Sequence, residues 1–287
     1  MRVQTKCLNP FFLLFLNYIR ICFNFEQDRI NQLLLKITFL GTGTSQGIPV
    51  ICCNCEVCHS DDPRDNRLRV SVLVETGDKT IVIDSGPDFR YQMLRAGVKD
   101  LDAIVYTHEH KDHVAGLDDI RPFNYLLQKN IDIYATERVQ DALKREFSYI
   151  FAEKVYPGIP QINVHTIATE NFYIGQTVLI PLQIMHYKLP ILGFRINDFT
   201  YITDAKTIPQ ETIDQIKGTK VLVVNALQVE PHISHFTLGE AIAFAQEIGA
   251  EMTYFTHIGH NMGKHADVEK ELPENIRLGY DGLVINL

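Results

Sequence analysis

The sequence predicts an α/β fold of four layers, αββα, in which two mixed β-sheets pack face to face and helices cover their outer faces. Short apolar, β-branched segments alternate with amphipathic helical segments, and this alternation occurs twice, over residues 36–161 and residues 162–287. The chain has 287 residues, 46% of them hydrophobic, which is enough to bury the core that a layered domain requires. We therefore expect one domain over residues 36–287.

Residues 1–35 differ in composition from the rest of the chain. Their apolar stretch, residues 9–19, is shorter than the roughly 20 residues needed to cross a bilayer. Basic residues precede it, as in a signal peptide, but no small-residue cleavage motif follows. A membrane anchor or an export signal is the alternative to a dispensable extension. We expect the extension, no membrane partner, and a cytoplasmic protein with free thiols.

In the first half, short apolar runs predict strands at Thr80–Ile83 and over residues 101–106. Amphipathic spacing predicts helices over residues 88–96, ending at Gly97, and over residues 136–147. In the second half, we expect three strands and one helix. The strands cover residues 178–184, 199–203 and 252–256, and the helix covers residues 238–248.

Residues 107–113 read Thr-His-Glu-His-Lys-Asp-His and concentrate potential metal ligands where a strand ends. His108 and His110 are two residues apart and point the same way in an extended chain. Asp112 and His113 turn toward a neighbouring position, where a helix is expected over residues 114–120. One segment can therefore offer two ligands to one metal ion and two to another. The alternative is a solvated, His-rich turn.

Further candidate ligands lie downstream, each at the end of an apolar, β-branched or aromatic run. They are His186, Asp204 and His257. Asp84 ends the run at Thr80–Ile83 in the same way, as a plain strand-end carboxylate also would. This repeated placement argues against the solvated turn.

Imidazole and carboxylate ligands suit zinc and manganese better than magnesium or calcium. Two such ions can activate a bridging water and bind the oxygens of the attacked group, so no serine or cysteine nucleophile is needed. A proton donor for the leaving group is still useful, and His235 is the candidate because it precedes the helix expected over residues 238–248. His232 is the alternative donor. A local hydrogen bond at the helix entry is the other interpretation of His235.

All six cysteines lie in the first 58 residues, whereas a disulfide framework would distribute them more widely. The spacing Cys53-x-Cys55-x-x-Cys58 can wrap three thiolates round one zinc ion. A closed structural site needs a fourth ligand, which the local sequence could take from Cys52 or His59. Chance clustering and redox chemistry are the alternatives.

The His-x-His-x-Asp-His sequence resembles the signature of the metallo-β-lactamase fold, a superfamily of mostly dinuclear hydrolases. The resemblance implies that Asp204 bridges two ions and that Asp84 supports the ligands from outside. It also implies two ligand sets, His108, His110 and His186 for the first ion and Asp112, His113 and His257 for the second.

A narrower resemblance is to the phosphoribosyl 1,2-cyclic phosphodiesterases. It rests on the Gly-rich residues 40–49, the Cys run that follows, His260 three residues after His257, and residues 278–283. It implies a structural zinc site, two active-site zinc or manganese ions, and a homodimer. The structural site would consist of Cys53, Cys55, Cys58 and His260.

The function implied by the resemblance is hydrolysis of a small cyclic ribose phosphodiester through a metal-bridging hydroxide, with Asp204 and His235 as catalytic residues. The net charge of −8 argues against broad nucleic-acid binding, since a polyanion needs a basic surface. The alternatives are an endonuclease of the transfer-RNA 3′-processing type, a thioesterase or lactamase-like hydrolase, and a non-catalytic accessory protein of the same fold. No substrate-binding residue is assigned, and residues 121–177 carry no recognisable family feature.

Overall fold

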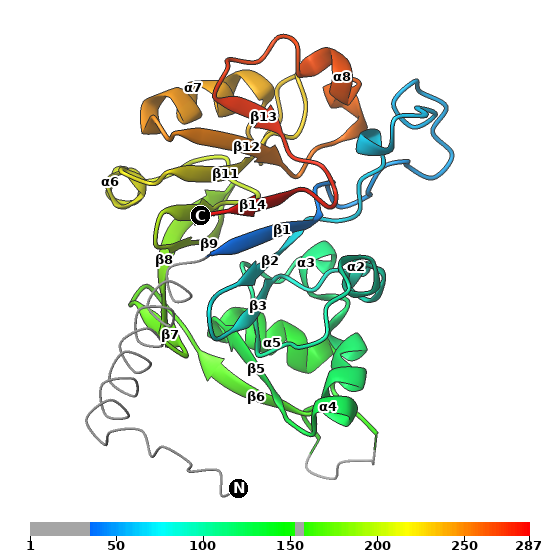
Figure 1. The fold of residues 1–287 in the computed structure, drawn as a ribbon, viewed down its shortest axis with the longest axis vertical. Helices are drawn as coiled ribbons and strands as arrows, with labels where there is room; N and C mark the ends of the chain where they lie inside the picture. Colours follow the sequence, from blue (N-terminus) through cyan, green and yellow to red (C-terminus); the bar gives the residue numbers. More distant parts are fainter. Residues whose placement is uncertain (1–34, 153–157) are drawn as a thin grey trace, which may run out of the picture.

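Two seven-stranded sheets form the centre of the computed structural model, which describes residues 35–152 and 158–287. The sheets pack face to face, with helices on both outer sides, so the αββα prediction is confirmed (Figure 1). The predicted extension lies outside the described residues except for Leu35. This residue is buried and exchanges backbone hydrogen bonds with Leu287.

The first sheet has the order β14-β1-β2-β3-β4-β5-β6, in which β3 to β6 run parallel to one another and the other neighbours are antiparallel. Its strands are β1 (Lys36–Gly41), β2 (Ser71–Glu75), β3 (Thr80–Ile83), β4 (Ala103–Val105), β5 (Ile131–Ala135), β6 (Ile162–Thr166) and β14 (Val284–Asn286).

The second sheet has the order β13-β12-β11-β10-β9-β8-β7, with β10 to β13 parallel and the rest antiparallel. Its strands are β7 (Phe172–Ile174), β8 (Thr177–His186), β9 (Leu189–Ile196), β10 (Phe199–Tyr201), β11 (Val221–Asn225), β12 (Met252–Thr256) and β13 (Ile276–Leu278). The two halves of the alternation, residues 36–161 and 162–287, do not coincide with the two sheets, because β6 and the C-terminal β14 both pair with the first sheet.

The helices lie in two outer layers (Figure 1). Beside the first sheet are α2 (Phe89–Ala96), α3 (Lys111–Val114), the 3-10 helix η2 (Leu117–Ile120), α4 (Arg121–Leu127) and α5 (Glu137–Glu146). Beside the second are α6 (Gln210–Ile216), α7 (Leu238–Ile248) and α8 (His265–Val268); η1 (Pro63–Asp65) and η3 (His260–Met262) lie in loops. Within the described ranges, no helix is both long and apolar enough to cross a membrane.

Three apolar clusters hold the layers together. One lies between the sheets and joins residues such as Phe39 and Val72 to Phe194 and Tyr201. The other two pack the outer face of each sheet against its helices. Because the sheets and helices are fixed by these cores, the loops at the strand ends are held on a rigid base.

The helix expected over residues 114–120 is interrupted in the structure. α3 ends at Val114, and a separate 3-10 turn, η2, follows Gly116. The amide of Gly116 donates to the carbonyl of Ser85 at 2.8 Å, and a side chain at Gly116 would lie 2.2 Å from the carbonyl oxygen of Gly86. The break therefore allows the chain to pack against the loop that begins at Asp84.

Candidate metal centre

The predicted ligands come together at one edge of the two packed sheets. Asp84 follows β3, the His cluster follows β4, and His186 is the last residue of β8. Asp204 follows β10 after two residues, and His257 follows β12 directly. Strand ends from both sheets thus supply one shared site.

Three of these residues have left-handed backbone conformations, with φ of 64° at Asp84, 56° at Asp204 and 54° at His257. Such conformations cost about 1–3 kcal/mol each in residues other than glycine. They persist because all three side chains and their strands are buried. The cost is consistent with a functional constraint on where these side chains point.

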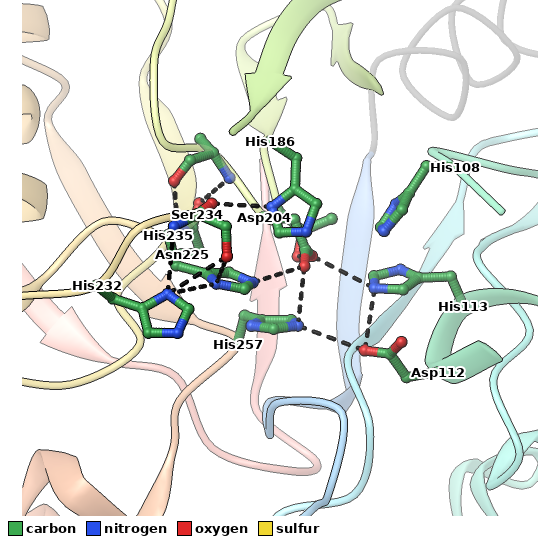
Figure 2. A network of polar contacts seen from close by, with 12 residues as sticks. His108, Asp112, His113, His186, Asp204, Asn225, His232, Ser234, His235 and His257 are labelled. Carbon is green, nitrogen blue, oxygen red and sulfur yellow. Dashed lines mark hydrogen bonds and ion pairs between the residues drawn. The ribbon is translucent and has the colours of Figure 1, made fainter. Parts of the chain in front are cut away.

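Asp204 lies at the centre of the cluster (Figure 2). Its Oδ1 is 2.9 Å from Nε2 of His235 and 3.2 Å from Nε2 of His257. Its Oδ2 is 3.3 Å from Nε2 of His113. Each carboxylate oxygen therefore has an imidazole beside it. His108 and His186, from the other predicted set, also have a ligand atom within 4.8 Å of this carboxylate.

One predicted ligand set lies together as expected. Nε2 of His113 and Nε2 of His257 are 3.3 Å and 3.5 Å from Oδ2 of Asp112. Ligand atoms of all three residues lie within 4.8 Å of one another. These distances leave room for one ion among the three side chains.

The other predicted set is more open. The ring centroids of His108 and His110 are 4.5 Å apart, and those of His110 and His186 are 5.1 Å apart. Among the described residues, however, the mutually close ligand sets group His108 with His113 and Asp204, and no such set includes His110. A third close set joins His186 and Asp204 to His235. His235, which we interpreted as a proton donor only, therefore lies as near to Asp204 as the predicted ligands do.

Several buried imidazole nitrogens in this cluster have no hydrogen-bond partner. They are Nε2 of His108, Nε2 of His113, and both ring nitrogens of His257. Burying a polar atom without a hydrogen-bond partner costs free energy and is rare, so these nitrogens indicate that a ligand binds here. Neutral imidazole nitrogens beside carboxylates form the donor set of zinc and manganese. The residues present therefore fit divalent metal ions.

Asp84 determines which nitrogens are free. Its carboxylate accepts hydrogen bonds from Nδ1 of His113 at 2.7 Å and from the amide and hydroxyl of Thr107, both at 2.8 Å. The Thr107 oxygen in turn lies 3.0 Å from Nδ1 of His108 and accepts its proton. With both Nδ1 atoms protonated, the Nε2 lone pairs of His113 and His108 point into the cluster.

His186 is oriented in a similar way. Its Nδ1 donates to the backbone carbonyl of Ser234 at 2.8 Å, which leaves its Nε2 free. The side chain of Ser234 contacts Nδ1 of His235 at 3.0 Å, and His232 lies 3.1 Å from the same nitrogen. The loop before α7 therefore positions a ligand and the candidate proton donor together.

The charges within the site also favour cations. Burial alone would raise the pKa of Asp204, but the imidazoles of His257 and His113 hold it well below its usual range. Burial likewise opposes a charged His113, yet Asp112, Asp84 and Asp204 raise its pKa well above the usual value. Three buried carboxylates thus draw positive charge to one place, which divalent ions can supply in place of protons.

The cysteine cluster lies in a separate loop. Sγ atoms of Cys53, Cys55 and Cys58 are 3.2, 3.5 and 3.7 Å from Nδ1 of His260. Hydrogen bonding by the amide of Cys58 is the main cause that lowers the pKa of the Cys55 thiol to about 6, which favours the thiolate a metal needs.

The two local candidates for the fourth ligand of the cysteine site do not lie among its three thiols. Cys52 is exposed, and Nδ1 of His59 contacts the carbonyl of Cys55 at 3.3 Å. His260, by contrast, lies three residues after His257, and the intervening Ile258 exchanges backbone hydrogen bonds with Thr42 and Thr44. The cysteine cluster is therefore tied to the loop that carries a candidate active-site ligand.

Sequence reasoning missed Thr107, Ser234 and the ion pair between Glu109 and Arg138, whose Nε and Oε1 atoms are 2.5 Å apart. Thr107 and Ser234 adjoin predicted site residues, which was the only signal available. Arg138 lies in α5, and nothing in its own segment connects it with the His cluster.

Comparisons with known proteins also indicate a hydrolase of the beta-lactamase superfamily. A family model described as a beta-lactamase superfamily domain matches residues 79–258. A solved structure of a new diphosphatase from the PhnP family has 39% sequence identity and a TM-score of 0.84, covering 88% of this chain and 97% of that one. A ribonuclease Z from Mycobacterium sp. (strain KMS) is 25% identical over 288 residues, covering 86% of this chain and 94% of that protein.

Another relative is an octanoyltransferase from Porphyromonas gingivalis, 38% identical over 252 residues. The match covers 87% of this chain but only 51% of the octanoyltransferase. The chain thus spans about half the length of that relative, whose name describes the whole protein.

Proposed function

The chain belongs to the beta-lactamase superfamily and, within it, to the PhnP family, and we propose that it hydrolyses a small phosphodiester, in the first place a cyclic ribose phosphate. The cluster of imidazoles around Asp204, with unpaired buried nitrogens, is the observation that supports this most strongly. Hydrolysis by such a site needs no serine or cysteine nucleophile.

We propose that two divalent ions, zinc or manganese, bind in the centre, and that Asp204 contacts both. His108, His110 and His186 would hold one ion, and Asp112, His113 and His257 the other. When bound, such ions lower the pKa of water toward about 7 and neutralise charge on phosphate oxygens. Asp84 and Thr107 keep the imidazoles in the tautomer that binds metal.

His235 is proposed to transfer a proton to the departing sugar oxygen. Its Nε2 faces Asp204, and its other nitrogen contacts Ser234 and His232, so the ring is held at both ends. Burial lowers the pKa of His235 to about 4, although the hydrogen bond to Asp204 opposes this, so the resting ring is neutral at pH 7. The ring would act as an acid after taking up a second proton, and would return to the neutral form when that proton passes to the sugar oxygen. His232, which is less buried, is placed to replace a proton that His235 gives up.

A cysteine-bound structural zinc is proposed as a separate element, held by Cys53, Cys55, Cys58 and His260. Its ligands form a group separate from those around Asp204, and no chemical role is proposed for it. Because its loop bonds to the segment after His257, the zinc would stabilise the position of that ligand.

A second candidate substrate is a phosphoric anhydride, because the PhnP-family relative with 39% identity is described as a diphosphatase. A third is transfer-RNA 3′ processing, favoured by relatives named ribonuclease Z. The net charge of −8 disfavours transfer-RNA processing, since electrostatic binding of a polyanion needs basic residues on the protein.

A substrate panel separates the three candidates. Protein loaded with zinc or manganese would be assayed for turnover of ribose 1,2-cyclic phosphate esters, dinucleoside diphosphates and a precursor transfer RNA. The proposal predicts that kcat/KM is highest for the cyclic phosphodiester. A preference for the diphosphate or for the RNA would replace the proposed substrate with that candidate.

A further inference from the structure

A partly open cavity of about 290 Å³ lies beside the metal centre. Its walls come from the segment after β4, from the first turn of α5, from β8 and β9, and from the loop after β6. His108 lines the cavity and also belongs to the ligand cluster. On the β8 side, the wall ends at Met185, which directly precedes His186. The cavity and the metal centre are therefore adjacent.

The wall of this cavity is largely apolar. Val139, Ile184, Met185, Ile191 and Leu192 contribute to it, together with two prolines. A volume near the lower end of the ~300–1,000 Å³ typical of ligand pockets suits one ring system rather than a strand of nucleic acid. An apolar wall of this kind binds the flat faces of a ring and excludes a phosphate group.

The charged groups at the rim neutralise each other. Nε of Arg138 donates to the carboxylate of Glu109 at 2.5 Å. Arg138 is more exposed than Glu109, with 58% and 17% of the two side chains accessible. Arg138 is the cationic side chain among the residues that line the cavity, and its pairing with Glu109 leaves the rim without net charge. The nearest place for a phosphate is therefore the metal centre beyond His108.

We infer that this cavity binds the non-reacting ring of a phosphate ester whose phosphate lies at the metal centre. The inference deepens the proposed function and rests on it for the position of the phosphate. It assigns the contacts that select the substrate to Thr136, Val139, Ala168, Thr169 and Met185. Among the small phosphodiesters of the proposed function, the favoured class carries one planar, weakly polar ring in addition to the sugar and the reacting phosphate.

Two small, exposed residues on the rim make the inference testable. Ala168→Phe and Thr169→Trp would each fill the cavity from its edge without disturbing the core, since both residues are exposed. Ala152→Phe is the matched control, because Ala152 is also exposed and does not line the cavity. Metal content and melting temperature of each variant would be measured first.

Binding of phenyl phosphate and of methyl phosphate to the zinc-loaded protein would then be measured by calorimetry. The two probes share the phosphate and differ in the ring. We expect the wild-type protein to bind phenyl phosphate at least about tenfold more tightly, as burial of one ring allows. The preference should disappear in both filling variants and persist in Ala152→Phe, with methyl phosphate affinity unchanged throughout.

Equal affinity of the wild-type protein for both probes, or an undiminished preference in the filling variants, would overturn the inference. Because calorimetry does not require turnover, the two proposals fail separately. A ring preference without phosphodiester hydrolysis would support the cavity and reject the proposed activity. Hydrolysis without a ring preference would support the proposed activity and reject the role of the cavity.

Discussion

Asp84 and His113 are joined by a hydrogen bond of 2.7 Å between a carboxylate oxygen and Nδ1, with both side chains completely buried. The bond fixes the tautomer of His113 and directs its Nε2 toward Asp112 and Asp204. Through Thr107, the same carboxylate also orients His108. One side chain outside the two proposed ligand sets thus orients a candidate ligand in each of them.

Replacing Asp84 by Asn should therefore weaken metal binding. Loss of an outer hydrogen-bond partner of this kind lowers metal affinity by about 10–100-fold. Zinc affinity would be measured by competition with a chelator, and Asp141→Asn, a change at an exposed position in α5, serves as control. Unchanged affinity in Asp84→Asn would show that Asp84 is a plain structural carboxylate.

The cysteine cluster gives a second prediction. Cys55→Ser should lower the zinc content of the purified protein by about one equivalent, because a closed site needs its four ligands. The melting temperature should fall as well, since metal binding contributes to folding free energy. Cys52→Ser is the matched control, because Cys52 is exposed and lies outside the cluster. If both variants behave like the wild-type protein, the structural zinc is absent.

His235→Ala tests the proposed proton transfer. The variant should keep its active-site metals while turnover falls by about 10²–10⁴-fold, the usual contribution of general acid catalysis. Metal content and kcat would be measured together, with His165→Ala, an exposed change in β6, as control. Full activity would remove His235 from the mechanism. Loss of metal would instead make it a ligand, as its proximity to Asp204 and His186 allows.

Much of the fold could be predicted because the signals are local. The strand at Thr80–Ile83, the strand at Met252–Thr256 and the helix at Leu238–Ile248 have the predicted bounds. Sheet membership could not be predicted in the same way, because β6 and β14 are short, largely exposed segments whose own sequences do not indicate a partner strand. The choice depends on pairing with β5 and β1, which is a property of the whole chain.

In the site, too, some features could be predicted from the sequence and others could not. Ligand types and their place at strand ends follow from the sequence, and the side chains do meet around Asp204. The position of His235 beside Asp204 depends on how the loop before α7 folds over His186, and no local pattern encodes that contact. The pairing of Arg138 with Glu109 brings two segments together and was missed for the same reason.

His265 gives a prediction for pH dependence. Burial, with a further contribution from Arg67 and Arg64, lowers the pKa of His265 from 6.5 to about 4. The folded state therefore keeps the ring neutral between pH 6.5 and 4, where the unfolded state takes up a proton. Stability contributed by this group is fully present above pH 6.5 and is lost as the pH falls toward 4.

His265→Asn removes that titration and retains an acceptor for Nη2 of Arg67, which lies 3.0 Å from Nδ1 of His265. The loss of unfolding free energy between pH 7 and pH 5 should be smaller in the variant by about 1–2 kcal/mol. Chemical denaturation at the two pH values measures this difference. An equal or greater loss in the variant would contradict the assigned role of His265.

The most direct test of the central claim is hydrolysis of bis(p-nitrophenyl) phosphate by protein reconstituted with manganese or zinc. Asp204→Asn provides the background, because it removes the carboxylate around which the candidate ligands cluster. The account predicts metal-dependent release of p-nitrophenol by the wild-type protein and at least about 10²-fold less by the variant. No turnover by a wild-type protein with both sites metallated, or equal turnover by the variant, would contradict it.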